Sequence, residues 1–521
     1  MPMERHLSWI DYAIIIGYLA AMVVIGVQAG RKKKDDDEYF LAGRQIPWFA
    51  IGLSIVATLI SSLSYISEPG EVFLSGLTNF SGKLIAIFLE TGFVLFLFIP
   101  FLMRFRFTSA YEYLGYRFNT ATRTLGVVFF SLQTVAWMGF VILAMARTMT
   151  EVTGMNLSLV ILTVGFITTL YTMVGGYRGV VWTDVAQFVL MFGGALGCVI
   201  YVMVKTGSWP GEWLTAAMEH HANKQTTSFI SFDPFHRSTV VTFALTMFVW
   251  HVCIHLGNQM TVQRYFSTSD LPRARKSFLL AVLGNLVINA LLVLVGLAIL
   301  YETLSAKGET GFSEAKKADM IFPRFMVDRL PPGLCGAVIT AVLAAAMSTI
   351  SSGFNSLATV LAVEKRTAEK KAQAGFAFYI TLAAGALATL LAFAIDLLVK
   401  DRNIVEMMPR SFNCFTAPLG GLFLLGIFVP WVTARAAFSA AIVALITAIL
   451  LAFGKEILGL EKNVSFTLVM PGSLLMMLLV ALVLSKIVPG EKSRVQGLTW
   501  FSRKQRPQID PTLVAQKFPG E

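Results

Sequence analysis

Thirteen apolar segments of bilayer length run through this chain of 521 residues, and they restrict its fold more than any other feature. A helix needs about 20 apolar residues to cross the hydrocarbon core, where a segment has to satisfy its own backbone hydrogen bonds. The segments are residues 8–29, 47–66, 82–103, 124–150, 157–175, 180–204, 238–262, 276–302, 332–362, 374–399, 411–430, 433–453 and 465–487. We therefore predict an all-α polytopic membrane protein.

The composition excludes an ordinary soluble globular domain, because 56% of the residues are hydrophobic and only 14% are charged. The formal net charge of +11 is carried mainly by short loops between apolar segments, so it predicts topology and not nucleic-acid binding. Four scattered cysteines show no metal-ligand spacing. The first apolar segment has bilayer length and is expected to remain as a helix, with no cleavable signal peptide.

The lysines and arginines predict the orientation. An odd number of helices puts the termini on opposite sides. With the N-terminus outside, 26 Lys and Arg residues fall in cytoplasmic segments and 14 outside, and 8 of those 14 lie in two long loops that weigh less. We expect a multi-pass protein of the plasma (inner) membrane, with a transmembrane domain over residues 1–487 and a cytoplasmic tail over residues 488–521.

A face of hydroxyl side chains occupies the ninth segment, in the stretch AVLAAAMSTISSGFNS at residues 341–356. Ser348, Ser351, Ser352 and Asn355 recur at i, i+3, i+4 and i+7, and Thr349 lies at the edge of their face. Small residues let another backbone approach, and clustered oxygens can replace water around Na⁺. The alternative is that each hydroxyl bonds back to its own helix, and the spacing leaves both interpretations open.

The second segment ends in ATLISSLSYISEPG, residues 57–70, which suits a continuous lipid-facing helix poorly. Non-helical backbone at membrane depth is tolerated only against protein or a wet cavity. We predict an interruption near Leu59 to Ser62 that frees carbonyl groups for a cation. A helix that simply ends early at Pro69 is the alternative.

Three further segments carry polar groups that are costly in a membrane. Lys83 needs a partner unless it snorkels to the interface, and Asp184 lies one turn into an apolar helix, where a capping role is the alternative. His251 and His255 have zinc-ligand spacing without an accompanying ligand set, so lining of an aqueous path is favoured over metal binding, with helix-helix hydrogen bonding as a further possibility.

Three motifs resemble the sodium:solute symporter family, which includes sodium/glucose, sodium/proline, iodide and sialic-acid cotransporters. They are YTMVGGYRGVVWTDVAQF at residues 171–188, NQMTVQRYFS at 258–267 and AAAMSTISSGFNS at 344–356, and the similarity extends from about Trp9 to Leu484. The resemblance implies a leucine-transporter-type core of two inverted five-helix repeats, about residues 47–204 and 238–430, each opening with an interrupted helix. It also implies sodium-coupled symport by alternating access.

The resemblance further implies one or two Na⁺ ions. The family's common sodium site corresponds to five residues whose carbonyl or hydroxyl oxygens bind the ion: Ala57, Ile60, Ala345, Ser348 and Thr349. A second site present in some members corresponds to Asp184, Ser348, Ser351 and Ser352. Each Na⁺ entering down 100 mV would supply about 2.3 kcal/mol.

The expected solute is a small organic anion, and a sodium-coupled sugar importer or a transporter-like solute sensor is the alternative. Sugar-carrying relatives have glutamine, glutamate and lysine where this chain has Ser64, Lys83 and Asn285. The stretch SSLSYISEPGEVF at residues 61–73 is more similar to the iodide, vitamin and monocarboxylate branch. The expected solute-lining residues are Ser62, Ser64, Tyr65, Lys83, His251, His255, Asn258, Asn285 and Asn413.

No convergent nucleophile, base and metal set is evident, so we expect no enzymatic activity. The expected partners are the solute and the lipid bilayer, with no nucleic acid and no obligate protein partner.

Overall fold

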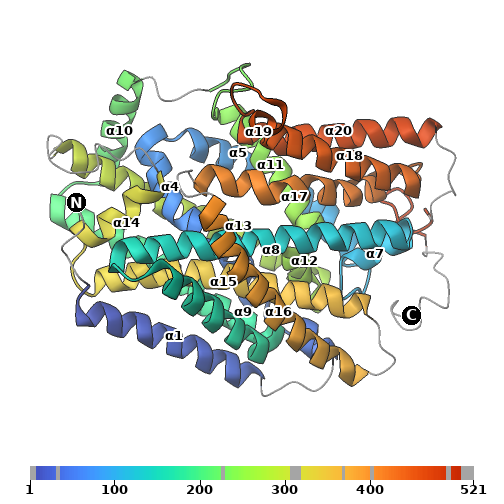
Figure 1. The fold of residues 1–521 in the computed structure, drawn as a ribbon, viewed down its shortest axis with the longest axis horizontal. Coiled ribbons are helices and arrows are strands. Elements are labelled where there is room, and N and C mark those ends of the chain that lie inside the picture. The colour runs from blue at the N-terminus through green and yellow to red at the C-terminus, as the bar shows by residue number, and fades with distance from the viewer. Residues whose placement is uncertain are drawn as a thin grey trace.

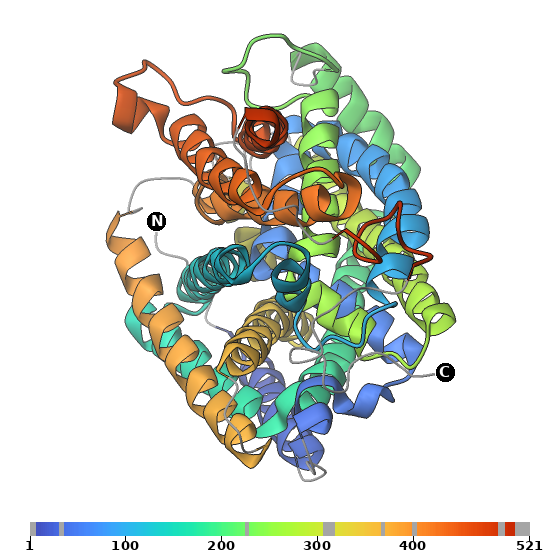
Figure 2. The same ribbon diagram turned by 90° about the vertical axis from the view of Figure 1, so that its right-hand side faces the viewer.

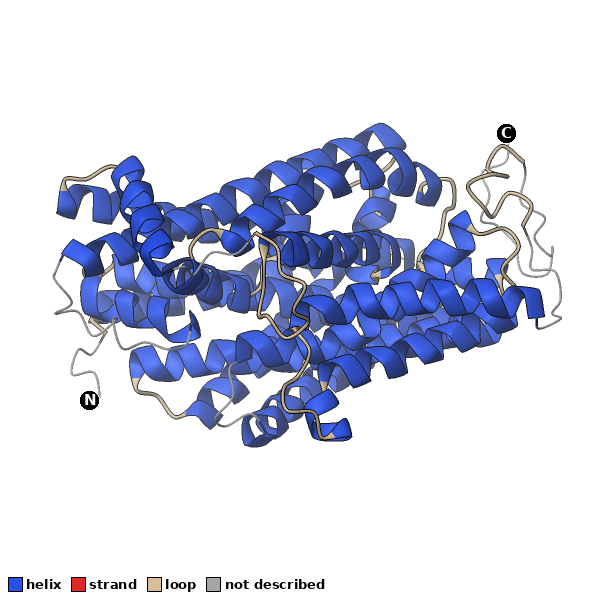
Figure 3. Ribbon diagram, turned by 90° about the horizontal axis from the view of Figure 1, so that it is seen from above, coloured by secondary structure: helices blue, strands red, loops and turns tan. Residues whose placement is uncertain are grey.

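The computed structural model describes residues 7–30, 36–224, 229–305, 318–365, 370–398, 404–487 and 495–505. These residues form helices and connecting segments without a β-strand (Figure 3). The long helices lie roughly along one axis, and the view along that axis shows them as a bundle (Figures 1 and 2). The first helix begins at the left-hand end of Figure 1 and the last finishes at the right-hand end, as an odd number of crossings requires.

The helices of the first half of the chain are α1 (Trp9–Gly30), α2 (Asp36–Leu41), the short η1 (Ala42–Arg44), α3 (Trp48–Leu59), α4 (Ser62–Ser75), α5 (Thr78–Phe93), η2 (Val94–Phe98), α6 (Ile99–Leu102), α7 (Tyr111–Arg117), α8 (Thr120–Thr153), α9 (Leu157–Thr206) and α10 (Pro210–Lys224). The helices of the second half are α11 (Val240–Gly257), α12 (Gln259–Phe266), α13 (Leu271–Ser305), α14 (Ala318–Arg329), α15 (Leu334–Glu364), α16 (Lys370–Leu398), α17 (Ile404–Phe428), α18 (Ala434–Ala452), α19 (Gly454–Leu458) and α20 (Phe466–Ile487).

The number of membrane crossings agrees with the prediction of thirteen. Among the described residues, eleven helices are long and apolar enough to span singly, and α3 with α4 makes a broken span bent by 65°. α9 has 50 residues, and at 1.5 Å per residue it is too long for a single crossing. Its backbone leaves the helical conformation at Gly176 (φ 59°, ψ −166°), between the predicted segments 157–175 and 180–204, so α9 crosses twice.

Two spans are interrupted, and each opens one half of the core. Ile60 and Ser61 are extended between α3 and α4, which confirms the predicted break. Pro69 lies inside α4, so the alternative of an early helix end is wrong. Asn258 is extended between α11 and α12, and its side chain accepts a hydrogen bond from the Met260 amide at 2.8 Å. The next four crossings after each break complete a unit of five spans, which is the repeat that the sequence resemblance implies.

α15 lies at the centre of the bundle and is its most enclosed span. In its most apolar stretch 89% of the residues are buried, and it packs against α9, α8, α1 and α16. Ala344, Ala345 and Ala346 are fully buried, since such small side chains allow neighbouring backbones to come close. The hydroxyl face of α15 is therefore turned toward protein and not toward lipid.

The contact between α13 and α4 depends on a glycine. A Cβ atom at Gly296 would lie 2.6 Å from the Pro69 carbonyl oxygen, whereas one at Gly193, on the exposed side of α9, would meet nothing within 4 Å. We expect Gly296→Ala to lower the melting temperature of the purified protein, because overpacking against backbone costs about 1–3 kcal/mol. Gly193→Ala should leave it unchanged or slightly higher. Equal melting temperatures for the two variants would contradict this close approach.

Candidate sodium and solute site

The break between α3 and α4 faces the hydroxyl side chains of α15. The Ser348 hydroxyl donates to the Ala57 carbonyl at 2.7 Å, and the Thr349 hydroxyl donates to the Thr58 carbonyl at 3.0 Å. Both hydroxyls also reach the Ala345 carbonyl at 3.1 Å. Ser348 and Thr349 therefore bond to their own helix, as one interpretation of the spacing has it, and also to the broken span.

The atoms gathered at this break suit a hard cation. They are neutral carbonyl and hydroxyl oxygens, held at membrane depth by helices that are far apart in sequence, and a Na⁺ ion prefers such oxygen ligands. Ser348 and Thr349 are fully buried, and Ile60, one residue before Ser61, is only 4% exposed. A hydroxyl that turns its hydrogen away presents its oxygen to the ion, so the arrangement can exchange hydrogen bonds for Na⁺ coordination.

A buried ion pair lies beside this region. The Arg264 guanidinium donates to the Asp184 carboxylate at 2.8 Å, to Ser352 at 2.6 Å and to Ser54 at 2.8 Å. Ser54 also donates to Asp184 at 2.6 Å. Asp184 is fully buried and Arg264 is 1% exposed, so the charges neutralise each other away from water.

Arg264 already contacts two residues of the second predicted sodium site. Asp184 and Ser352 come together as expected, but a guanidinium already bridges them. Ser351 donates instead to the Ser348 carbonyl at 3.1 Å. The second Asp184 oxygen, Oδ1, is buried without a hydrogen-bond partner among the described residues, so it is the ligand atom still available to an ion.

A cavity of about 200 Å³, lined by both apolar and polar side chains, adjoins the break. Ile60, Ser61 and Ser64 line it at the start of α4, and Lys83 reaches it from α5. Lys83 donates to the Glu68 carboxylate at 2.7 Å and to the Asn289 side-chain oxygen at 2.8 Å. Lys83 therefore has polar partners within the protein, which was one of the two possibilities, and does not snorkel to the interface.

Five of the predicted lining residues face this cavity: Ser64, Lys83, His251, Asn285 and Asn413. The other four have different contacts. Ser62 donates to the Val141 carbonyl, Tyr65 to the Met191 carbonyl, Asn258 caps α12, and His255 contacts the Tyr265 hydroxyl at 2.6 Å. Helical spacing alone does not distinguish a residue that lines the cavity from one directed at the neighbouring helix.

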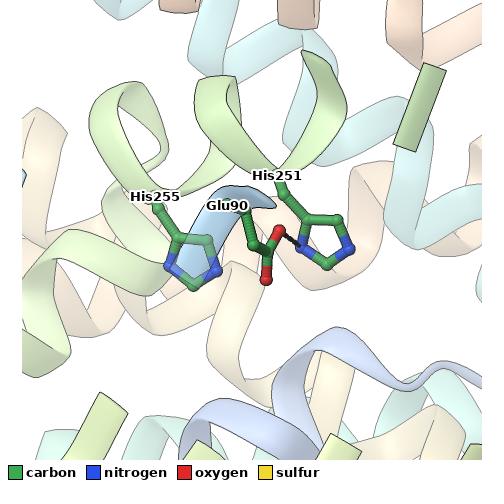
Figure 4. A group of neighbouring side chains, drawn as sticks. All are labelled: Glu90, His251 and His255. Atoms are coloured by element: carbon green, nitrogen blue, oxygen red, sulfur yellow. Dashed lines mark ion pairs between the residues drawn. The ribbon is translucent and has the colours of Figure 1, made fainter. Parts of the chain in front are cut away.

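Several functional groups were missed by the sequence analysis. Arg237 binds the Glu71 carboxylate with two hydrogen bonds of 2.6 and 2.8 Å at the cavity wall, and Glu90 meets the histidines of α11 (Figure 4). The sequence feature that could have indicated Glu90 is a carboxylate inside an apolar segment. Its partners are about 160 residues away in sequence, so no local spacing connects them.

The broken first helix of each repeat and the oxygen cluster at the first break define a secondary transporter built to bind a cation at membrane depth. The model of the sodium:solute symporter family matches residues 39–444, and the chain belongs to this family.

Several characterised proteins are similar over most of this chain. The sodium/sialic acid symporter SiaT of Proteus mirabilis is 27% identical and covers 87% of this chain and 92% of its own. The sodium-dependent multivitamin transporter of Oryctolagus cuniculus is 32% identical and covers 86% and 70%. The sodium-coupled monocarboxylate transporter 1 of Homo sapiens is 28% identical and covers 81% and 69%.

A solved Na⁺-coupled sialic acid symporter, in a substrate-bound outward-open state, has the same fold. The superposition has a TM-score of 0.80 at 25% identity, and it covers 93% of this chain and 99% of that one. A closed nucleobase-cation symporter, Mhp1, matches with a TM-score of 0.54 at 13% identity, which shows the fold alone. The leucine-transporter-type architecture is therefore shown for this chain.

The buried ion pair predicts a non-additive loss of stability when both of its residues are mutated. Asp184→Asn leaves Arg264 unpaired in the interior, and Arg264→Met does the same to Asp184, so each should cost about 3–5 kcal/mol of stability. The double variant should lose less than the sum of the two, as melting in detergent would measure. Arg273→Met is the matched control, since its pair with Asp270 is exposed and 3.5 Å long. An Asp184→Asn variant as stable as that control would contradict the coupling.

Proposed function

We propose that this protein imports a small organic anion together with Na⁺, using the break between α3 and α4 as the shared element of both sites. The observation that carries the proposal is that Ala57 and Thr58 contact the α15 hydroxyls. They directly precede the cavity residues Leu59, Ile60 and Ser61. An ion that orders this stretch also orders the cavity wall. Binding of either ligand therefore favours binding of the other.

Two features of the cavity support an anionic solute. Leu63 and Ser64, at the start of α4, line it, so the positive end of this helix dipole lies near the solute. The Lys83 ammonium lies in the same wall, and the amides of Asn285 and Asn413 offer further hydrogen bonds. The names of the similar transporters, which include sialic acid and monocarboxylate carriers, agree with a carboxylate-bearing solute.

A neutral polar solute is the second candidate, because the cavity cations are already paired. Lys83 contacts Glu68 and Arg237 contacts Glu71, so the four side chains sum to no net charge. An anion has to compete with Glu68 for Lys83, whereas a sugar does not. This pairing keeps the sugar importer under consideration.

We assign the main sodium site to Ala57, Ile60, Ala345, Ser348 and Thr349, and a second ion to the free oxygen of Asp184 with Ser348, Ser351 and Ser352. The second ion requires Arg264 to release Ser352 or to share Asp184. One Na⁺ supplies about 2.3 kcal/mol per 100 mV, and two supply about twice that. We further propose that the N-terminus faces outward, that the C-terminus is cytoplasmic and that transport needs no obligate protein partner.

Uptake into proteoliposomes tests the proposal. The purified protein should accumulate at least one of labelled sialic acid and lactate when a sodium gradient is imposed, and choline in place of Na⁺ should abolish uptake. Glucose should not be accumulated. Uptake that is unchanged in choline would refute the coupling, and uptake of glucose alone would replace the anion with the sugar.

A hydroxyl deletion tests the main sodium site. Ser348→Ala removes one oxygen ligand, worth about 1 kcal/mol, so the Na⁺ concentration for half-maximal uptake should rise about fivefold. Ser356→Ala is the matched control, because its hydroxyl is also buried on α15 but donates to Gln263 at 3.0 Å. The assignment would be wrong if both variants gave the wild-type sodium activation curve.

A further inference from the structure

A carboxylate and two imidazoles meet in the interior, apart from the sodium ligands. Glu90 comes from α5, and His251 and His255 come from successive turns of α11 (Figure 4). Their exposed fractions are 2%, 4% and 2%. One potential ligand atom from each residue lies within 4.8 Å of the other two, and this is the only such group among the residues that the structure describes.

We propose that Glu90, His251 and His255 form a binding site for a first-row transition-metal ion of the Zn²⁺ type. Two imidazole nitrogens and one carboxylate oxygen are the protein ligands of many zinc sites that keep a fourth position open. The Na⁺ site is different in kind, because it consists of oxygen atoms only. The spacing of the histidines does not reveal the third ligand, so that spacing alone favoured a polar lining.

Two of the potential ligand atoms are otherwise unused. Glu90 Oε2 and His251 Nδ1 lie 2.6 Å apart, yet neither has a partner of hydrogen-bond geometry in the described part of the chain. Buried polar atoms without such partners are rare in folded proteins. An ion bound by both atoms would satisfy them together.

His255 is already oriented as a metal ligand. Its Nδ1 lies 2.6 Å from the Tyr265 hydroxyl, and Figure 4 shows its other ring nitrogen turned toward Glu90. Metal-binding histidines usually hold their second nitrogen in such a hydrogen bond, which fixes the ring and the free lone pair. The two histidine rings are nearly parallel, at 8°, so both nitrogens approach the carboxylate from one helix.

The charge around Glu90 also favours a cation. The nearest cationic side chain on its own helix, Lys83, is two turns away and is held by Glu68 and Asn289. Among the described residues, the one ion pair of Glu90 is with His251. A carboxylate in the membrane interior needs a compensating charge, and a divalent ion supplies it.

Metal binding requires only a small adjustment. Bonds of about 2.0–2.1 Å in a tetrahedral site separate ligand atoms by about 3.3 Å, so Glu90 and His251 must part by roughly 0.7 Å. Rotation of the long Glu90 side chain provides this movement. The ion would then fasten the last turns of α11, just before the break at Asn258, to α5, and His251 would carry the effect to the cavity wall.

Equilibrium binding of Zn²⁺ to the full-length protein in detergent, after removal of any affinity tag, tests the proposal. We expect one Zn²⁺ per chain, a higher melting temperature with Zn²⁺, and a visible absorption band of tetrahedral type when Co²⁺ replaces it. Glu90→Gln and His255→Gln should each weaken binding at least tenfold, whereas Tyr265→Phe should weaken it about tenfold without abolishing it.

Matched controls separate this site from other histidines. His236→Gln changes an exposed loop histidine, and the His220→Gln/His221→Gln variant removes the adjacent pair on α10. Both should bind Zn²⁺ as the wild type does. His251→Cys should retain binding, since a thiolate is also a zinc ligand, and it guards against misfolding of the other variants. The proposal would be overturned if the folded wild type bound no stoichiometric Zn²⁺, if Glu90→Gln bound it unchanged, or if the α10 variant alone abolished binding.

Discussion

Unwound backbone at membrane depth is the constraint on which the rest of the structure depends. Between α3 and α4 the chain leaves the helical conformation, so the carbonyls that precede the break lose their partners within the helix. Lipid offers no replacement. Ser348 and Thr349 supply it from α15, and the alanines beside them allow that helix to come close enough. The same oxygens that stabilise the break are the ones that we propose as Na⁺ ligands.

A buried ion pair and a hydrogen bond of Lys83 connect the two repeats around this centre. Asp184 belongs to the last span of the first repeat, and Arg264 belongs to the broken first span of the second. Lys83 likewise contacts Glu68 in its own repeat and Asn289 in the other. In a low dielectric such contacts are strong only while every group is satisfied. If the two repeats move relative to each other during alternating access, the charged side chains between them therefore have to find new partners.

Much of the fold could be predicted from the sequence, because the bilayer reduces the problem to apolar segments and their interruptions. The end of one apolar segment at residue 175 agrees with the turn at Gly176. The break after Leu59 was predicted from a stretch that suits a continuous lipid-facing helix poorly. The family resemblance then supplied the arrangement of the repeats.

The partners of buried side chains could not be predicted in the same way. Arg264 lies 80 residues from Asp184, and Glu90 lies far from the histidines that it meets. His255 and Tyr65 were expected at the solute path, but each has its polar atom directed at a neighbouring helix. Periodicity shows which residues share a face. It does not show which helix that face meets, since this depends on tertiary packing.

Direct measurement of Na⁺ binding tests the central claim that the oxygens of the first break and of α15 hold this ion. Radioactive Na⁺ should bind the purified protein saturably without any solute, and the double variant Ser348→Ala/Thr349→Val should lose most of that binding while keeping its fold. Absence of saturable binding to the wild type, or full binding to the double variant, would contradict the claim.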